Sequence, residues 1–452
     1  MAQTRICFIG GGSYNWMPKL LGDLALTDTL SGSVVLHDVN PAALDDIQRY
    51  GRKVLQTTGS QFSIETTTDL DRALDGAEFV VVTITTGGLP TMALDLEIPE
   101  RYGIYQSVGD TVGPGGLSRA LRNVPVIVGI AQAMERRCPD AWMLNLTNPL
   151  TVLTRVVTMT TRVKAMGLCH ELFGVRGALM RIFGASVDEF EMRVAGINHL
   201  IWLLDLTIGG RDGLQMVRDW AAEGRSVPLP PSRGEWHEPF VDRWKLKLKL
   251  FSLYDALPAA GDRHLAEFFP YFLTDQTRQG QDYGVQLTRI AHRERQVASA
   301  REAVHAAISS SEPLRVNRSP EATADIVSAV ANGHSVRTIV NLPNTGQIEN
   351  LPRGAVVETL AEITSAGAFP LTVGAVPHGV LSTLEPHVVN QEMIARAALA
   401  GDRHLALQAM VGDPLVHDLP KAEAILDELL AAHAEYLPQF NRRRPASSLA
   451  AA

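Results

Sequence analysis

The chain has 452 residues, 46% of them hydrophobic and 20% charged, a composition that is typical of a folded protein and excludes an intrinsically disordered one. This length suits two domains, or one domain with a large second lobe. Its formal net charge of −8 comes from interspersed acidic and basic residues, so no nucleic-acid partner is expected, although a local basic pocket for an anionic substrate is compatible with it. The three cysteines, Cys7, Cys138 and Cys169, are widely spaced, which argues against a disulfide framework and favours a reducing compartment.

Neither a membrane span nor a secretion signal is expected. No apolar run approaches 18 residues without charges, and no signal-peptide pattern precedes the first expected strand. We therefore expect a cytoplasmic protein without a membrane partner. The last residues, 441–452, are expected to fray.

The chain begins with the pattern of a strand, a glycine turn and a helix. An apolar run at residues 5–9 is followed by a helical pattern from about 17 to 26. Between them stand Gly10, Gly11, Gly12 and Ser13. In a dinucleotide-binding turn such glycines let the backbone approach a pyrophosphate, which the N–H groups of the following helix then bind. Asn15 replaces the third glycine of the G-x-G-x-x-G motif, so the turn alone is a weak indication.

The strand expected at residues 34–37 ends at Asp38, whose carboxylate could accept hydrogen bonds from an adenosine ribose. A carboxylate there disfavours a 2′-phosphate, so NAD is preferred to NADP as the predicted cofactor. The structural alternative is a glycine turn and an Asp38 that caps a helix without any ligand.

Three further apolar runs, at 79–84, 141–146 and 163–168, are expected to be strands separated by helices. This alternation predicts an α/β fold with an N-terminal Rossmann-like parallel sheet, in which ligands bind at the carboxyl ends of the strands. Thr86 and Asn148 follow two of these strands, so we expect them to lie beside the cofactor and its substrate.

Residues 108–116 are too rich in glycine for a helix or a strand and carry Asp110 and a threonine. A helix is expected from Leu117, with Arg119 and Arg122 on one face at i, i+3. The segment is either part of a site or a structural turn, and spacing alone does not choose between them.

Two residues at the ends of strand-like runs are candidate metal ligands. Cys169 follows the run at 163–168, and His199 closes the sequence Gly-Ile-Asn-His. A thiolate and an imidazole can converge on one ion. The alternative is structural, because a buried cysteine is more often a small hydrophobic residue and a single histidine in an apolar run more often a core residue.

We place the NAD-binding domain at residues 1–195 and a second domain, a mixed α+β lobe for substrate, metal and oligomerisation contacts, at 196–452. Helical patterns in this lobe run at about 239–257, 288–309 and 390–436, and polar clusters lie at 259–267 and 340–346.

Together these segments resemble glycoside hydrolase family 4, whose members hydrolyse glycosides with the help of bound NAD and a divalent metal. The resemblance covers nearly the whole chain. The motifs that carry it are Gly10 to Ser13, Asn148-Pro149, Cys169-His170, Asn198-His199 and Asn341 to Asn344. It implies a lactate/malate dehydrogenase-like fold and a homodimer or homotetramer.

Within the family the chain looks most like the α-galacturonidase branch. The segments 109–116, 169–174 and 261–268 carry this likeness, with Leu172 where the branch usually has Val. His170 speaks against 6-phosphosugars, because members that act on them carry Asp or Asn after the metal cysteine. The implied substrate is a small α-galacturonide. An α-glucuronide or a sulfoquinovoside would need similar charges.

The resemblance also implies a reaction. NAD⁺ accepts a hydride from C3 of the sugar, a base removes the proton at C2, the aglycone leaves, water adds at C1 and the hydride returns. Mn²⁺ or another divalent transition metal, held by Cys169 and His199, would polarise the C3 carbonyl. Asp262 is implied as the base and His170 as the acid that protonates the leaving oxygen.

Alternatives stay open for these roles. Asp262 could cap a helix or pair with Arg263, and His170 could orient the metal site. The contacts implied for sugar hydroxyls, nicotinamide, metal-bound water and the acidic group are Asn148, Asn198, Asp110, Arg119, Arg263 and His264.

Two other functions are compatible with the N-terminal half: a net NAD-dependent dehydrogenase of hydroxy acids, and an NAD-binding sensor without activity. The presence together of Cys169, His170, His199 and Asp262 argues against the sensor.

Overall fold

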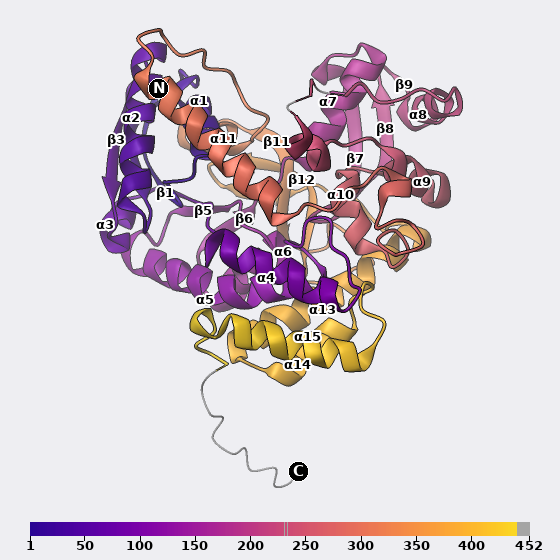
Figure 1. The fold of residues 1–452 in the computed structure, drawn as a ribbon. Coiled ribbons are helices and arrows are strands. Elements are labelled where there is room, and N and C mark those ends of the chain that lie inside the picture. The colour runs from indigo at the N-terminus through magenta and orange to yellow at the C-terminus, as the bar shows by residue number, and fades with distance from the viewer. Residues whose placement is uncertain (230, 233, 441–452) are drawn as a thin grey trace.

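One mixed sheet runs through the described part of the chain, residues 1–229, 231–232 and 234–440 of this computed structural model (Figure 1). Its 13 strands are β1 (Ala2–Ile9), β2 (Leu30–His37), β3 (Phe62–Thr67), β4 (Phe79–Val82), β5 (Trp142–Asn145), β6 (Lys164–Gly167), β7 (Phe190–Ile197), β8 (Leu200–Ile208), β9 (Arg211–Asp212), β10 (Leu257–Pro258), β11 (Val336–Pro343), β12 (Val356–Thr364) and β13 (Gly367–Pro370). The expected fraying at 441–452 lies outside the described residues.

The helices of the first half are α1 (Met17–Ala25), α2 (Pro41–Thr58), α3 (Leu70–Leu74), α4 (Gly88–Arg101), α5 (Gly113–Arg137), α6 (Leu150–Thr160) and α7 (Glu171–Phe183). Those of the second half are α8 (Gly213–Ala222), α9 (Lys245–Tyr254), α10 (Asp262–Leu265), α11 (Ile290–Ser309), α12 (Thr323–Asn332), α13 (His378–Ala400), α14 (Arg403–Val411) and α15 (Leu419–Ala432). Among the described residues, no helix combines the length and the apolar character that a membrane crossing requires.

The first six strands are parallel, in the order β3, β2, β1, β4, β5, β6. This is the strand order of a dinucleotide-binding sheet, which binds its ligand where the order reverses, between β1 and β4. Strand β4 is buried throughout, because helices cover both faces of the sheet. The predicted Rossmann-like sheet is confirmed.

The second half continues the same sheet with antiparallel strands. Strand β11 joins β6 through the pair Asn341 and Gly167, and β12, β7, β8 and β10 follow outward. The predicted mixed lobe is thus confirmed, but it is fused to the first half by backbone pairing. The predicted domain boundary at residue 195 falls inside β7.

Several helix limits differ from the expected ones. Helix α5 begins at Gly113, four residues before the expected start at Leu117, because Pro114 has a fixed φ that suits a first helical turn. Helix α9 begins only at Lys245, after a 3₁₀ segment at Glu235–Phe240. The C-terminal helical region begins at residue 378 rather than 390. It is divided into α13, α14 and α15.

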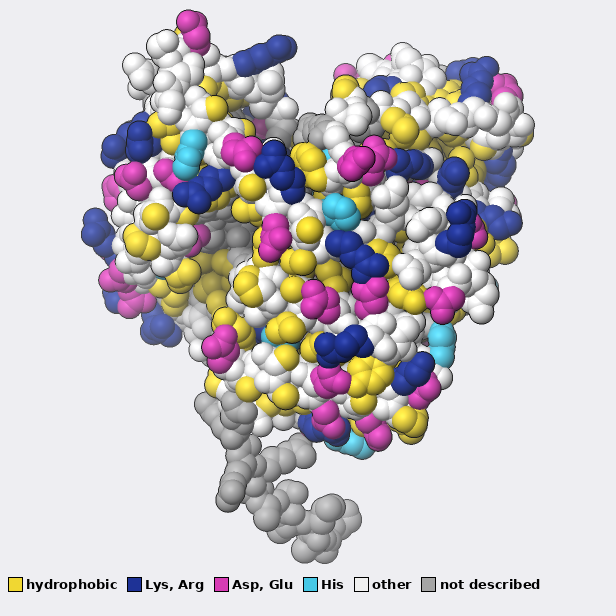
Figure 2. Space-filling model, in the orientation of Figure 1, with side chains coloured by type: hydrophobic (Ala, Val, Ile, Leu, Met, Phe, Trp, Pro, Cys, Tyr) yellow, Lys and Arg dark blue, Asp and Glu magenta, His cyan; other side chains and the backbone are white. Residues whose placement is uncertain are grey.

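Figure 1 shows how the helices bring the halves together. Helix α11 lies across the front of the first half, against α2 and α4, although it belongs to the second half by sequence. The C-terminal helices α13 to α15 pack below α4 and α5. Over the face in Figure 2, basic and acidic side chains are interspersed, as the sequence predicts.

Candidate active site

The predicted cofactor turn connects β1 to α1. A Cβ atom on Gly10, whose φ is +90°, would lie 2.2 Å from the carbonyl oxygen of Thr83, so only glycine fits there. Gly12 donates its N–H to Asp38 Oδ2 at 3.0 Å. Asn40, not Asp38, caps α2. The capping alternative for Asp38 is therefore wrong, and its carboxylate lies against the glycine turn at the end of β2.

Two neighbouring cavities open at the carboxyl end of the parallel sheet. The smaller, of about 370 Å³, is lined by Ser13, Arg119 and Asn148 among others, and we call it the cofactor cavity. The larger, of about 540 Å³, is called the catalytic cavity and is lined in part by His170, His199, Arg263 and His264. Both cavities share Asn15, Trp16, Asp110, Asn148, Arg293 and Gln296. A ligand in one cavity would therefore contact a ligand in the other.

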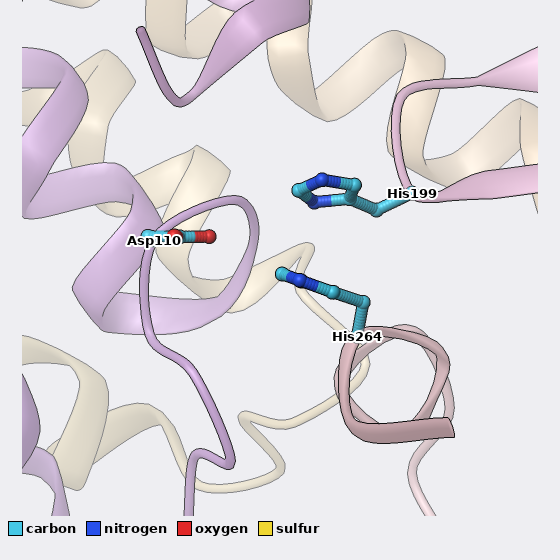
Figure 3. A group of neighbouring side chains, drawn as sticks. All are labelled: Asp110, His199 and His264. Carbon is cyan, nitrogen blue, oxygen red and sulfur yellow. The ribbon is translucent and has the colours of Figure 1, made fainter. Parts of the chain in front are cut away.

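Three side chains from separate segments converge on the catalytic cavity (Figure 3). Asp110 lies in the loop before α5, His199 in the turn between β7 and β8, and His264 on α10. Their ligand atoms all lie within 4.8 Å of one another. A carboxylate and two imidazoles at this separation are a donor set that divalent transition metals accept.

Hydrogen bonds orient His199 for such a role. Thr111 Oγ1 lies 2.8 Å from Asp110 Oδ1 and 2.8 Å from His199 Nδ1. An ionised carboxylate only accepts, so the Thr111 hydroxyl donates to Asp110 and accepts the Nδ1 proton of His199. The Nε2 lone pair of His199 is then available for a metal. Its left-handed backbone, with φ of 67°, is the kind of strain that concentrates at functional sites.

Their buried position favours the neutral form of the two histidine rings. Their centroids lie 3.8 Å apart. Burial, followed by the charge of the neighbouring imidazole, lowers the pKa of His264 well below its ordinary value. Burial also lowers the pKa of His199. Neutral imidazole is the form that binds a metal, so both rings are ready to act as ligands.

Cys169, the predicted thiolate ligand, is not a member of this group. Burial, and then the carboxylates of Glu358 and Glu171, raise the pKa of its thiol well above the ordinary value. These surroundings favour the neutral thiol, and a bound cation would be needed to favour the thiolate. The ligand role of Cys169 therefore stays a prediction.

Asn198 lies behind the catalytic cavity rather than in its wall. Its side chain is fully buried and donates to Glu358 Oε2 at 3.3 Å. It also hydrogen-bonds Cys169. Asn198 is thus placed to hold Cys169 and Glu358, and its predicted contact with a sugar is not supported by its position.

His170, the predicted acid, lines the catalytic cavity and is partly exposed. Its Nδ1 lies 3.3 Å from Glu321 Oε1, and its ring meets the edge of Trp16. The next residue, Glu171, accepts the N–H of Gly261, and its Oε1 lies 3.9 Å from His264 Nε2. His170 thus lies in the cavity wall with Glu321 beside it, whereas Glu171 supports the histidine on α10.

Asp262, the predicted base, does not line the cavity. Its oxygens accept the N–H groups of Leu246 at 3.2 Å and Lys247 at 3.0 Å, in the first turn of α9. Asp262 therefore caps a helix, as the structural alternative predicted, but the helix that it caps is the neighbouring α9. Burial and then the charge of Asp242 raise the pKa of Asp262 to about 7. Asp242, which the sequence did not single out, does line the cavity and lies 2.9 Å from Lys247 Nζ.

Two arginines share one aromatic ring in the wall of the catalytic cavity. Arg263 lies 4.8 Å and Arg293 5.1 Å from the ring centre of Phe240. The buried Nε atoms of both arginines have no hydrogen-bond partner among the described residues. Burial, and then the charge of Arg263, lower the pKa of Arg293 to about 9. Arg293 lies in a helical pattern that carries no signal of function, so sequence reasoning missed it.

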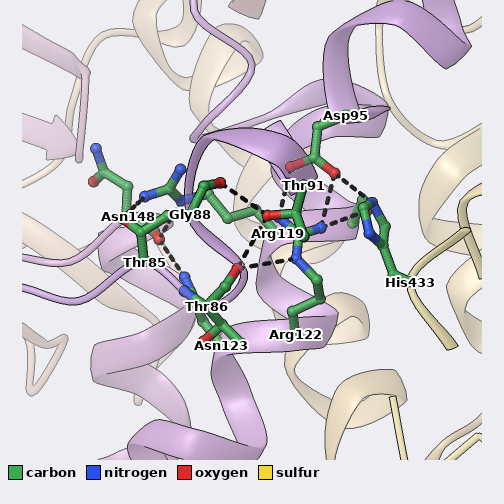
Figure 4. Close-up of polar contacts among 12 residues, drawn as sticks. Thr85, Thr86, Gly88, Thr91, Asp95, Arg119, Arg122, Asn123, Asn148 and His433 are labelled. Atoms are coloured by element: carbon green, nitrogen blue, oxygen red, sulfur yellow. Dashed lines mark hydrogen bonds and ion pairs between the residues drawn. The ribbon is translucent and has the colours of Figure 1, made fainter. Parts of the chain in front are cut away.

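The loops that carry Asp110 and Asn148 are held by buried polar contacts. Glu267 accepts the N–H groups of Val108 and Gly109 at 2.7 and 2.8 Å. Arg119 donates to the carbonyl of Asn148 at 3.0 Å and so helps to position this loop (Figure 4). It also lines the cofactor cavity, and its predicted contact with the substrate stays a prediction.

The same network extends to the C-terminal helices (Figure 4). Arg122 forms two bonds with Asp95, at 2.8 and 2.6 Å, and His433 Nε2 lies 3.1 Å from Asp95. These three side chains are fully buried. Thr86, a predicted cofactor residue, does not line the cofactor cavity, and its N–H is held by Asn123. Thr86 and the buried charges thus support the walls of the cavity from behind.

Replacing Asp95 with Asn should lower the free energy of unfolding by about 3–5 kcal/mol at pH 7, because Arg122 would stay buried without its counter-charge. Burial opposes ionisation, but His433 and Arg122 hold the pKa of Asp95 below its ordinary value. The wild-type advantage is therefore complete above about pH 4 and shrinks as the pH falls further. Urea unfolding at pH 7 and pH 3 measures both effects. Arg137→Gln, which breaks an exposed pair with Asp71, is the control, and an equal loss there would contradict the argument.

Comparison with known proteins identifies the family. The model of the family 4 glycosyl hydrolases matches residues 5–185, and the model of their C-terminal domain matches residues 194–416. An α-galacturonidase of Bacillus subtilis is 36% identical over 438 residues, which is 95% of this chain and 97% of that protein.

Solved structures of similar proteins lead to the same family and fold. A Bacillus subtilis protein, 36% identical, has a TM-score of 0.88 over 95% of this chain and 100% of its own. A 6-phospho-β-glucosidase of Thermotoga maritima was solved with manganese, NAD⁺ and glucose-6-phosphate. It is 22% identical and has a TM-score of 0.79 over 96% of this chain and 99% of that chain, so this likeness supports the fold. The resemblance seen in the sequence is confirmed, and the chain belongs to the family 4 glycosyl hydrolases.

Proposed function

We propose that this glycosidase hydrolyses α-galacturonides, or closely similar acidic α-glycosides, with the help of bound NAD and a divalent metal such as Mn²⁺. Membership of the family argues against the alternatives of a net dehydrogenase and a sensor. The acidic substrate rests on one observation above all, the arginine pair in the wall of the catalytic cavity. The α-galacturonidases among the relatives, 33–36% identical, support the same substrate.

The pair of Arg263 and Arg293 suits a planar carboxylate. Two guanidinium groups on one Phe240 ring repel each other, and their buried Nε–H groups have no partner among the described residues. A uronate carboxylate would neutralise this charge and accept hydrogen bonds from both, in the geometry that arginine offers better than lysine. A neutral sugar would offer the two guanidinium groups no further counter-charge.

The residues present fit both implied cofactors. Asp110, His199 and His264 supply a carboxylate and two neutral imidazoles, which suit Mn²⁺ or a related ion. The Nδ1 atom of His264 is buried and has no hydrogen-bond partner in the described part of the chain. The glycine turn and Asp38 suit the pyrophosphate and ribose of NAD. When bound, the pair would supply reversible hydride transfer and Lewis acidity.

The chain's own residues would then position the sugar and move its protons. Arg263 and Arg293 hold the acidic group, and Asn148, at the junction of the two cavities, meets both sugar and nicotinamide. His170 protonates the leaving oxygen from its partly exposed place in the wall. Asp262 would serve as the C2 base only after it leaves the N-terminus of α9, whereas Asp242 already faces the cavity.

Metal-stripped protein should cleave an aryl α-D-galacturonide only when NAD⁺ and Mn²⁺ are both returned. In D₂O the released sugar should carry deuterium at C2, because a base removes that proton during turnover. Release of the aryl group measures the cleavage, and NMR of the product measures the deuterium at C2. Hydrolysis without exchange would refute the mechanism, and stoichiometric NADH would indicate a dehydrogenase.

Arg293→Met should lower kcat/KM for the aryl galacturonide about 10- to 100-fold, since a charged hydrogen bond contributes about 1.5–3 kcal/mol. The aryl α-D-galactoside, which lacks the carboxylate, should lose much less. Arg295→Met is the matched control, because Arg295 lies on the same helix but pairs with Glu302 at the surface. Equal losses on both substrates would contradict a carboxylate contact.

Calorimetry with Mn²⁺ alone can show which of the candidate residues bind the metal. We expect His199→Gln to lose binding and Cys169→Ser to weaken it at least about tenfold, with unchanged thermal unfolding. If Cys169→Ser binds Mn²⁺ like the wild type while His264→Gln does not, the thiolate prediction is wrong and the group with Asp110 holds the ion. Self-association and a cytoplasmic location stay predictions.

A further inference from the structure

Glu321 is a buried acid that none of the roles described above uses. It lies in the segment between α11 and α12, and its side chain is 4% exposed. Its Oε1 atom has no hydrogen bond of good geometry among the described residues, although it lies 3.3 Å from His170 Nδ1. Burial raises the pKa of Glu321, and the charges of His170 and Lys19 oppose this rise. An unpartnered carboxylate oxygen in such a place opposes folding, which indicates a functional reason for its position.

The imidazole of His170 is half-exposed at the start of α7 and lines the catalytic cavity. A side chain with this freedom occupies several rotamers, and only some of them direct Nε2 at a leaving oxygen. Nε2 lies 4.0 Å from Oε1 of Glu171, which also lines the cavity. Glu321, by contrast, does not belong to the lining. Its carboxylate therefore meets the imidazole from behind, at the nitrogen away from the cavity.

Helix α1 fixes both groups that contact the ring of His170. Trp16, whose ring centre lies 6.2 Å from that of His170, stands directly before the first turn of α1. Two turns further along the helix, the buried Asp23 accepts the N–H of Ser319 at 2.6 Å and also its hydroxyl. Ser319 Oγ in turn accepts the N–H of Glu321 at 3.2 Å. One helix thus holds Trp16 and Glu321 relative to each other, and the imidazole is in contact with both.

We infer that Glu321 is a positioning residue for the acid step: it accepts the Nδ1–H of His170 and thereby directs Nε2 at the leaving oxygen. As the C1–O bond breaks, Nε2 gives its proton to that oxygen and Nδ1 keeps its own, so no proton passes to Glu321. The close approach becomes a hydrogen bond when the leaving group fixes the ring, since catalytic hydrogen bonds are often poorly aligned before the substrate binds. The inference rests on the proposed function and extends it, because no motif of the sequence indicated Glu321.

The leaving group distinguishes this role from a purely structural one. Nitrophenolate leaves with little help from an acid, whereas phenolate needs more, so a badly directed His170 slows mainly the phenyl glycoside. We expect kcat/KM for the phenyl glycoside, divided by kcat/KM for the nitrophenyl glycoside, to fall about tenfold in Glu321→Leu, a part of the roughly 100- to 10,000-fold that a general acid contributes. Glu321→Gln keeps an oxygen acceptor and should recover part of the ratio. Equal losses on both glycosides, or an unchanged ratio in Glu321→Leu, would overturn the inference.

A matched variant and a double variant serve as controls. Glu312→Leu removes an exposed acid of the same segment that lines neither cavity, and it should leave the ratio unchanged. In the His170→Ala background, Glu321→Leu should change the ratio no further, because a positioning residue acts only through its partner. A further fall in that background would mean that Glu321 acts without His170, which contradicts the inference.

The same ratio separates this inference from the proposed substrate. It is measured on the phenyl and nitrophenyl α-glycosides of whichever sugar the wild-type protein cleaves. Cleavage of galactosides but not of galacturonides would refute the acidic substrate, and the ratio on galactosides would still decide the role of Glu321.

Discussion

The hydrogen bonds that join Asp110, Thr111 and His199 hold the two halves of the molecule together at the site. They connect the loop before α5, which belongs to the parallel half, to the turn between β7 and β8. Glu267 fixes the same loop from the second half through two backbone N–H groups. In a buried setting such bonds have little freedom to rearrange, so the geometry of the catalytic cavity depends on the packing of both halves.

This placement explains why the site carries features that oppose folding. Arg263 and Arg293 lie over the same ring with buried Nε–H groups that have no partner among the described residues, and His199 has a left-handed backbone. Each feature costs free energy and is offset by the long apolar sheet that runs through both halves. A charged sugar and a metal would supply the partners that these buried polar atoms lack among the described residues.

Helix α11 gives the two ligand sites a common wall. It contributes Arg293 and Gln296 to both cavities, and it crosses the front of the first half (Figure 1). In the proposed reaction the cofactor is regenerated at every turnover, so it has to stay beside the sugar. A helix shared by the two cavities would hold substrate and cofactor next to each other.

The sequence by itself determined the parts that depend on local pattern. Apolar runs and the glycine turn predict the Rossmann-like sheet, because short stretches encode strands, turns and helix starts. The motifs around Asn148, Cys169 and His199 indicate the family through their resemblance to its members. Only the tertiary structure decided which side chains meet. It brought His264 to Asp110 and His199, turned Asp262 toward α9, and placed Arg293 of a featureless helix in the cavity wall. These contacts join residues far apart in the chain, and no local periodicity records them.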